Sequence, residues 1–471
     1  MKTRILLMVM LGLVGLSGKG QRERTLNWFF GNKADLKFYP TLTSDTLGQM
    51  PIVEGCSSIS DSCGNLLFYT NGITVYSKNN SIMQNGTGLG GNQSATQSAL
   101  IVPQPGNDSI YFIFTIGIEF FAYSKVNINQ NGGLGNVIAI NDSLCYSGSE
   151  KIAGILHCNG SDVWVVTKKP FFTNVYNSFL VNSSGVSTTP IESTVHYTPY
   201  TDDEGYLKFS PNGNYIAGVN MELRTVSLLT FDNCTGQINN FITIPSDTNV
   251  YGLSFSPDNT KLYIANTLNT GHPLSYIYQY DLTSGDSATI LSTKTLIKVL
   301  PYNTFFGALQ LGADGRIYIT KYHYTAFDFN SLSTINYPNL IGSACGYQDS
   351  SVSLSTRYCE IGLPNFIESY FNVDYSCLTS AGIKENNFVS TFSLFPNPFT
   401  TQATLTFQGI KNENNKSLSV YNLLGQEVQN IFVGKDKEVI IHKNNLPRGM
   451  YFYKLMDDSK TVLGMGKMVV E

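Results

Sequence analysis

The chain has little charge, histidine or tryptophan. Charged residues make up 14% of its 471 positions, whereas soluble proteins average about 25%. Five His and two Trp are present. Past the N-terminal segment, the sequence contains no His-Glu-x-x-His, no phosphate-binding loop and no Gly-x-Ser-x-Gly. It therefore offers no motif for metalloprotease, nucleotide or α/β-hydrolase chemistry. We predict no catalytic residues and favour a protein that is not an enzyme.

The N-terminus has the pattern of a signal peptide. Lys2 and Arg4 precede an apolar stretch at residues 5–16, and small residues follow up to Gly20. Such a stretch is too short to span a bilayer stably. We predict that residues 1–20 are removed on export. No later apolar run reaches about 18 residues, so we expect no transmembrane segment in the mature chain.

Acidic residues outnumber basic ones in the body of the chain but not in its tail. Residues 392–471 contain nine Lys and Arg against seven Asp and Glu, whereas residues 21–391 contain 18 against 27. Proteins that bind nucleic acids depend on basic surfaces. We therefore expect no nucleic-acid partner.

The eight Cys permit disulfides in an exported chain. They lack the paired spacing of a zinc site. We predict Cys145 with Cys158 and Cys345 with Cys359 as the first pairs to test, because each pair encloses a turn. The full connectivity stays open, as does the alternative that several Cys are small buried side chains.

Six similar segments recur along the body. The clearest copies lie at residues 206–217, 252–265 and 307–320, and weaker copies at 58–69, 100–112 and 155–166. Each copy is a short alternating strand, a turn of Pro, Asn, Asp or Gly, and a strand of β-branched and aromatic residues. The turn residues at 65, 107, 159, 212, 258 and 314 are 42 to 56 positions apart. One hairpin per unit of this length is typical of a β-propeller with four-stranded blades.

These hairpins resemble those of WD-repeat-like propellers in exported bacterial proteins. Residues 27–31 and 61–72 are similar to a propeller-containing group of Bacteroidetes surface proteins. We predict an all-β propeller over residues 21–375. Seven blades are preferred, with six or eight as alternatives and an array of β-sandwiches as the structural runner-up. Pairing of the N-terminal strand near residues 28–38 with residues 361–371 would close the ring and remove its free edges.

The tail after a predicted linker at residues 376–391 has its own pattern. Residues 395–398 read Phe-Pro-Asn-Pro, residues 446–453 read Leu-Pro-Arg-Gly-Met-Tyr-Phe-Tyr, and a Lys stands at position 467. Strand patterns at residues 404–407, 418–421, 438–441, 449–455 and 461–470 predict a small β-sandwich.

This tail resembles the type A C-terminal sorting domain of Bacteroidetes type IX secretion cargo. The resemblance implies that residues 392–471 bind the secretion machinery and direct the chain to the cell surface or the medium. It also implies a sorting signal at Pro396, Asn397, Pro398, Gly425, Gly449, Tyr451 and Lys467. The prolines would hold their segment extended, and Lys467 is the candidate receptor contact. A fibronectin-like accessory domain is the alternative.

An acidic and aromatic cluster precedes the innermost strand of one predicted blade. In a propeller, the loops that lead into the innermost strands gather at one face, around the central channel. We predict binding residues there at Tyr200, Asp202, Asp203, Glu204, Tyr206, Tyr251, Phe305 and Phe306. Asp202, Asp203 and Glu204 are also candidate ligands for Ca²⁺, the one cofactor considered. The alternative is a solvated acidic turn whose aromatic neighbours cap the core.

The predicted function is non-catalytic binding or adhesion by a secreted propeller, with a carbohydrate or protein as ligand. Two alternatives remain. One is a secreted hydrolase or lyase that acts on polysaccharide or peptide, and the other is a structural surface component linked to gliding. Two carboxylates about 5–9.5 Å apart in a cleft would favour the enzyme. An exposed aromatic rim without such a pair would favour binding.

Overall fold

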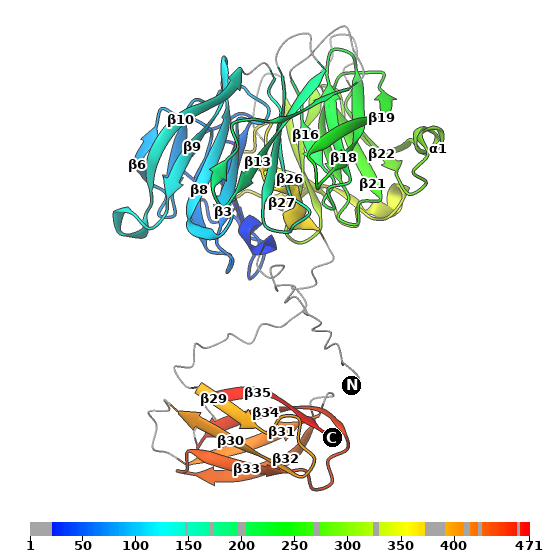
Figure 1. The fold of residues 1–471 in the computed structure, drawn as a ribbon. Coiled ribbons are helices and arrows are strands. Elements are labelled where there is room, and N and C mark those ends of the chain that lie inside the picture. Colours follow the sequence, from blue (N-terminus) through cyan, green and yellow to red (C-terminus); the bar gives the residue numbers. More distant parts are fainter. Residues whose placement is uncertain are drawn as a thin grey trace, which may run out of the picture. The chain divides into compact units, whose positions relative to one another are not determined.

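The computed structural model describes residues 21–146, 149–169, 174–195, 204–267, 274–323, 329–372, 391–408, 415–422, 426–458 and 462–471. The chain divides into two compact units, Met1–Ser376 and Cys377–Glu471 (Figure 1). The predicted signal peptide lies outside the described residues, as does the predicted linker except for Thr391. None of the helices in the described part has the length and hydropathy needed to cross a membrane.

The first unit is a succession of antiparallel sheets, each built from strands that follow one another in sequence. The first sheet contains β3 (Cys56–Ser60), β4 (Leu66–Thr70), β5 (Thr74–Ser77) and β6 (Ile82–Thr87), and the second contains β7 (Ala99–Gln104), β8 (Asn107–Ile116), β9 (Phe120–Asn127) and β10 (Asn136–Tyr146). These two are joined at their outer strands, where β10 pairs in parallel with β6 at Asn136 and Gln84. The third sheet contains β11 (Ile152–Leu156), β12 (Val163–Lys168) and β13 (Val175–Asn182), with both β14 (Gly185–Val186) and β15 (Ile191–Thr194) on β13.

Three further sheets complete this succession in the described residues. They are β16 (Leu207–Phe209), β17 (Tyr215–Asn220), β18 (Thr225–Asp232) and β19 (Gln237–Pro245); β20 (Val250–Phe255), β21 (Lys261–Asn266), β22 (Tyr276–Asp281) and β23 (Thr295–Val299); and β24 (Thr304–Leu311), β25 (Ile317–His323), β26 (Ser331–Ile335) and β27 (Tyr347–Ser353). Short helices η2 (Asn131–Gly133), α1 (Ser287–Ser292) and η3 (Gly342–Cys345) lie in connections between strands.

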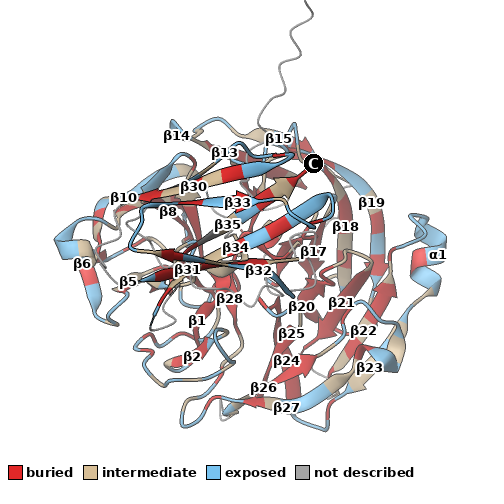
Figure 2. Cartoon of the chain, turned by 90° about the horizontal axis from the view of Figure 1, so that it is seen from below, coloured by how far each residue is buried: buried red, intermediate tan, exposed pale blue. Residues whose placement is uncertain are grey.

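The sheets stand around a common centre. The first strand of each sheet contacts the first strand of the next, in the order β3, β7, β11, β16, β20 and β24, and Figure 2 shows the sheets following one another in a ring. These innermost strands are almost wholly buried. The predicted all-β propeller is therefore confirmed, because this is the arrangement that defines the architecture.

A seventh, smaller sheet completes the ring. After η1 (Arg22–Thr25), β1 (Asn27–Phe30) pairs with β2 (Ala34–Lys37), and β1 contacts β3 of the first sheet. On the other side, the fully buried ring of Trp28 lies 5.3 Å from the ring of Tyr318 in β25. The N-terminal strand closes the circle as expected, but by another pairing. β1 pairs with β2, whereas β28 (Pro364–Asn365) pairs in parallel with β3.

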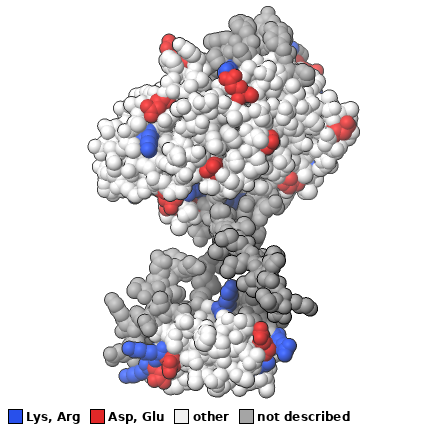
Figure 3. Space-filling view, in the orientation of Figure 1, with Lys and Arg blue, Asp and Glu red and all other residues white. Residues whose placement is uncertain are grey.

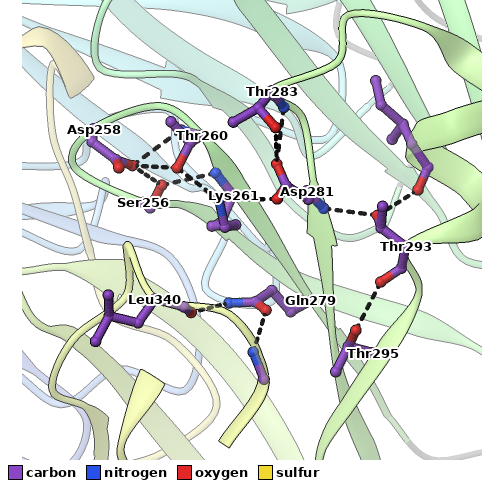
Figure 4. Close-up of polar contacts among 12 residues, drawn as sticks. Ser256, Asp258, Thr260, Lys261, Gln279, Asp281, Thr283, Thr293, Thr295 and Leu340 are labelled. Carbon is purple, nitrogen blue, oxygen red and sulfur yellow. Dashed lines mark hydrogen bonds and ion pairs between the residues drawn. The ribbon is translucent and has the colours of Figure 1, made fainter. Parts of the chain in front are cut away.

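The repeated hairpin joins the first two strands of a sheet at all six predicted positions. In the fifth sheet, the Ser256 hydroxyl donates to Asp258 Oδ1 at 2.6 Å and accepts from the backbone N–H of Lys261 at 2.9 Å (Figure 4). Ser210 and Asn212 repeat the first bond at 2.8 Å in the fourth sheet. The Ser-Pro-Asn/Asp sequence therefore closes the turn with its own side chains.

The centre of the ring is filled by the chain itself. β28 contacts the innermost strands β3 and β7, and η4 (Glu368–Phe371) contacts β11 and β16. Asn365 is 2% exposed. Its carbonyl accepts from Ser57 Oγ of β3 at 2.8 Å, and its Nδ2 donates to the Ile152 carbonyl of β11 at 3.0 Å. Through its backbone carbonyl and its side-chain amide, Asn365 thus links the first sheet to the third.

A disulfide joins Cys158 to Cys234, with a Cα–Cα distance of 5.1 Å and a sequence separation of 76. It connects the first turn of the third sheet to a turn of the fourth. The predicted pair of Cys145 with Cys158 is therefore wrong, and Cys345 is a free, buried thiol, as is Cys359. The prediction failed because enclosing a turn along the chain does not bring two side chains together, whereas neighbouring blades do.

The second unit is a sandwich of two sheets. One contains β29 (Thr391–Phe395), β30 (Gln402–Gln408) and β33 (Glu438–His442), and the other contains β32 (Glu427–Gly434), β31 (Lys416–Tyr421), β34 (Gly449–Asp457) and β35 (Val462–Val470). Leu405, Leu418, Ile441 and Leu455 are fully buried in one core. All five predicted strands are present, and β29 and β32 were not predicted.

Candidate functional site

We use the term leading face for the side of the propeller at which the innermost strands begin. Four of the five predicted binding residues that the structure describes are buried. Tyr206 is 1% exposed, Tyr251 6%, Phe305 1% and Phe306 0%. These four rings therefore belong to the core and do not form the expected aromatic rim. Tyr200, Asp202 and Asp203 lie outside the described residues, and Glu204 is exposed.

Three glutamates lie at equivalent places on the leading face. Glu54, Glu150 and Glu204 each stand two or three residues before an innermost strand, namely β3, β11 and β16. They are close enough to influence one another. The pKa of Glu54 is raised from 4.5 to about 8, chiefly by burial and in addition by the charges of Glu150 and Glu204, whereas a hydrogen bond from Tyr251 acts in the opposite direction. The ring thus gathers carboxylates from three blades.

Hydrogen bonds connect the starts of these blades. Glu150 Oε2 accepts from both the backbone N–H and the hydroxyl of Thr96, each at 2.8 Å. Thr96 Oγ1 in turn accepts from the backbone N–H of Gly205 at 3.0 Å. Lys151 Nζ donates to the Glu204 carbonyl at 2.6 Å. These hydrogen bonds therefore hold the Glu150 carboxylate and the backbone of Glu204 in place, and they join the second, third and fourth sheets.

Two tyrosines lie beneath the carboxylates. The rings of Tyr206 and Tyr251 meet edge to face, with 5.5 Å between their centroids. Both hydroxyls are buried, and that of Tyr251 lies within reach of the Glu54 carboxyl and the Thr96 hydroxyl. Burial raises the pKa of Tyr251 well above its usual value, and the nearby Glu54 carboxyl adds to the rise. Both hydroxyls therefore stay protonated at neutral pH, and each can form a further hydrogen bond.

Charge is sparse on one side of the propeller (Figure 3). Figure 3 shows charged side chains scattered sparsely over the face of the propeller in view. Within the ranges the structure describes, no three His, Cys, Asp or Glu side chains are placed to hold one metal ion. Glu204 is the only described member of the calcium ligand set proposed from sequence.

Sequence reasoning identified Glu204 and missed Glu54, Thr96 and Glu150. The signal was nonetheless present in the repeats. Each of these residues stands two or three positions before the first strand of a sheet. When the repeat copies are superposed, these four residues therefore occupy equivalent positions at the same end of the innermost strands.

The sorting residues of the tail come together across the sandwich. Asn397, between Pro396 and Pro398, accepts from the backbone N–H of Val469 at 2.8 Å and donates to the Lys467 carbonyl at 3.4 Å. The start of the motif thus holds the last strand, although 70 residues separate Asn397 from Lys467.

The remaining sorting residues have separate roles. Lys467 is exposed and lies opposite Phe452 in β34. The Tyr451 hydroxyl donates to the Pro447 carbonyl at 2.8 Å. Gly449 begins β34 with a φ of +155°, and Gly425 lies outside the described residues.

Residues 393–471 match the family described as the secretion system C-terminal sorting domain. The chain is thus a β-propeller protein that carries a sorting domain. It is cargo of the type IX secretion system, delivered across the outer membrane to the surface or the medium, and its tail engages that machinery. No curated protein matches the chain.

Several solved structures are similar over most of their length. A protein of unknown function from Desulfotomaculum acetoxidans is 13% identical, with 80% of this chain and 94% of that chain covered and a TM-score of 0.37. A putative 6-phosphogluconolactonase from Bacteroides uniformis is 12% identical, with 72% and 98% covered and a TM-score of 0.37. The periplasmic gluconolactonase of Pseudomonas aeruginosa is 14% identical, with 77% and 97% covered and a TM-score of 0.34. Likeness at this level says nothing about the activity of this chain.

Proposed function

We propose that the mature protein is a non-catalytic binding or adhesion module that engages an extracellular ligand through its leading face. The observation that carries this proposal is the convergence of Glu54, Glu150 and Glu204 from three blades at the side where the innermost strands begin. Because β28 and η4 fill the centre, a ligand can reach these side chains only at the surface. Polar groups that converge from several blades on a rigid ring are a common basis for recognition.

The framework around the site also supports binding. Glu150 is fixed by two hydrogen bonds from Thr96. The innermost strands behind it are buried on both faces. A site built on such strands loses little conformational entropy when a ligand binds, which increases affinity.

The test uses the purified mature chain, residues 21–471, on arrays of glycans and of peptides. We expect selective retention of one ligand class without any change in that ligand. Glu150→Ala should abolish the retention, whereas Glu438→Ala, an exposed change in the sorting domain, should not. Equal binding by wild type and Glu150→Ala would contradict the proposal.

A secreted hydrolase or lyase is the second candidate, because one specific observation favours it. A carboxyl group whose pKa is raised to about 8 beside other carboxylates is suited to act as a general acid. If this candidate is correct, mass spectrometry will detect new reducing ends or peptide fragments after incubation with the retained ligand. Glu54→Gln should then stop the reaction and leave retention intact.

A structural surface component linked to gliding is the third candidate. The filled channel supports it, because a ring braced at its centre is suited to carry load. In this case a chain that carries Glu54→Gln and Glu150→Gln would restore surface motility to a deletion strain as well as wild type does.

A further inference from the structure

A groove in the second unit is lined by part of the sorting motif. It lies where β31 ends and both β32 and β34 begin, since Tyr421 pairs with Glu427 on one side and with Phe452 on the other. One wall contains Leu446, Pro447 and Tyr451. The volume of the groove is about 610 Å³, which is within the range of ligand sites.

Carboxamide side chains supply the polar part of this groove. They belong to Asn422, Gln429, Asn444 and Asn445. Asn422 closes the turn between β31 and β32, because its Nδ2 donates to Gln426 Oε1 at 2.9 Å and its Oδ1 accepts from the backbone N–H of Gln426 at 3.0 Å. Asn444 and Asn445 are exposed, and their side chains form no hydrogen bond with another described residue. Their donors and acceptors are therefore available to a ligand.

The carboxamide of Gln429 points to a missing partner. Its Oε1 is buried and accepts no hydrogen bond among the described residues. A buried acceptor without a donor destabilises a fold. The last torsion of a glutamine side chain is soft, so a small rotation directs this oxygen to an N–H group placed in the groove.

The lining selects a neutral ligand that both donates and accepts hydrogen bonds. Of the described residues that line the groove, none is Lys, Arg, His, Asp or Glu, so a phosphate or an ammonium meets no opposite charge there. A carboxamide donates and accepts as a peptide group does. An extended polypeptide offers its N–H and C=O groups in alternation, and Leu446 and Pro447 give its side chains an apolar surface.

A polypeptide fits this groove better than a sugar does. Sugar rings are commonly bound by stacking on exposed aromatic faces. Tyr451 is the one aromatic side chain among the described lining residues, and it is 5% exposed. Its ring packs in the core of the sandwich, and its hydroxyl donates to the Pro447 carbonyl. The groove therefore lacks a surface on which a sugar could stack.

We propose that this groove binds an extended segment of a protein component of the type IX secretion machinery. The kind of partner follows from the family, because residues 393–471 form the domain that engages this machinery. Gln429 and Asn445 hydrogen-bond the backbone of the segment, and Leu446 and Pro447 contact its side chains. This site is separate from the leading face and does not depend on the ligand proposed there.

The first experiment measures binding of the labelled mature chain to isolated outer membranes. Membranes of a strain without the secretion machinery give the background. We expect saturable binding above this background that is lost when the membranes are treated with protease beforehand. The variant Gln429→Met/Asn445→Leu should bind about tenfold more weakly, because it loses two hydrogen bonds and keeps similar side-chain volumes. Glu438→Gln, at the start of β33 and outside the lining of the groove, is the matched control.

The second experiment identifies the contact by photo-crosslinking in living cells. The photoreactive residue p-benzoylphenylalanine replaces Asn445 in the full chain, or Glu438 as the control. We expect position 445 alone to form a crosslink to a machinery component, which mass spectrometry identifies together with the joined peptide. Both positions are exposed, so this result decides the question even if thermal melting shows that the double variant is unfolded.

Four results would overturn the proposal. Binding that survives protease treatment would assign the groove to a polysaccharide or a lipid, and a crosslink to a second copy of this chain would make the groove a dimer contact. Unweakened binding by a folded double variant would place recognition elsewhere on the domain, as would equal crosslinking from positions 445 and 438. These results leave the sorting assignment intact, because only normal display of a chain without residues 392–471 contradicts it.

Discussion

Lys208 Nζ lies 2.9 Å from Glu368 Oε1, and both side chains are buried, with exposed fractions of 2% and 5%. Lys208 belongs to the innermost strand β16, and Glu368 begins η4 in the centre of the ring. Gln310 of β24 also accepts a hydrogen bond from Lys208. One ion pair therefore fixes the segment that fills the channel to two blades.

Breaking this pair will destabilise the propeller strongly. Lys208→Met leaves an unpaired buried carboxylate, so we expect the free energy of unfolding to fall by about 3–5 kcal/mol. The double variant Lys208→Met/Glu368→Leu should regain most of the lost free energy of unfolding. Denaturant titration followed by tryptophan fluorescence measures this free energy, since Trp28 and Trp164 both lie in the propeller.

The exposed pair Lys169–Glu192 is the control for this experiment. Loss of this ion pair should lower the free energy of unfolding by no more than about 1 kcal/mol. An equally small effect of Lys208→Met would contradict the role given to the buried pair.

The disulfide between Cys158 and Cys234 should stabilise the folded propeller. Replacing both residues by Ser releases a loop closed over 76 positions. We expect the free energy of unfolding to fall by about 2–4 kcal/mol, because the unfolded chain gains entropy. Thermal melting with and without reductant checks this. Cys63→Ser, at an exposed free thiol, is the control and should leave the melting temperature unchanged.

The stability of the protein should fall with rising pH in the range set by Glu54. The folded chain keeps the proton of this carboxyl up to about pH 8, whereas the unfolded chain loses it near its usual pKa of 4.5. The stabilising contribution is therefore full below the lower value and is lost as pH rises through the upper one. Glu54→Gln should show a smaller drop in melting temperature between about pH 5 and about pH 9. Parallel pH profiles for the two proteins would refute the assignment.

The sorting domain should be required for export past the outer membrane. A chain without residues 392–471 should stay in the periplasm, which cell fractionation and surface proteolysis can show. Asn397→Ala removes the side chain that holds β35, so we expect reduced display. Asn430→Ala, a change at an exposed position of β32, is the matched control. Normal display of the truncated chain would contradict the assignment.

Local patterns were sufficient to predict the elements but not all of their partners. The turn at Ser256 and Asp258 closes through its own side chains, so the hairpin can be read from five residues. The disulfide could not be predicted in this way, because Cys158 meets Cys234 only when two blades pack side by side. A sequence pattern does not distinguish an aromatic residue that is buried in a core, as Tyr251 and Phe305 are, from one that is exposed on a rim. Their burial depends on the neighbouring strands.

The sequence alone determined the propeller architecture and the destination of the chain. Turn chemistry and strand alternation act over a few residues, and the sorting pattern lies within one small domain. The tertiary structure decided that Pro364–Asn365 and Glu368–Phe371 pack against innermost strands of several blades, and that Glu54 lies near enough to Glu150 for the charge of one to raise the pKa of the other. Asn365 and its hydrogen-bond partner Ser57, for example, are 308 positions apart. Only closure of the ring, which buries apolar surface between all its blades, brings them together.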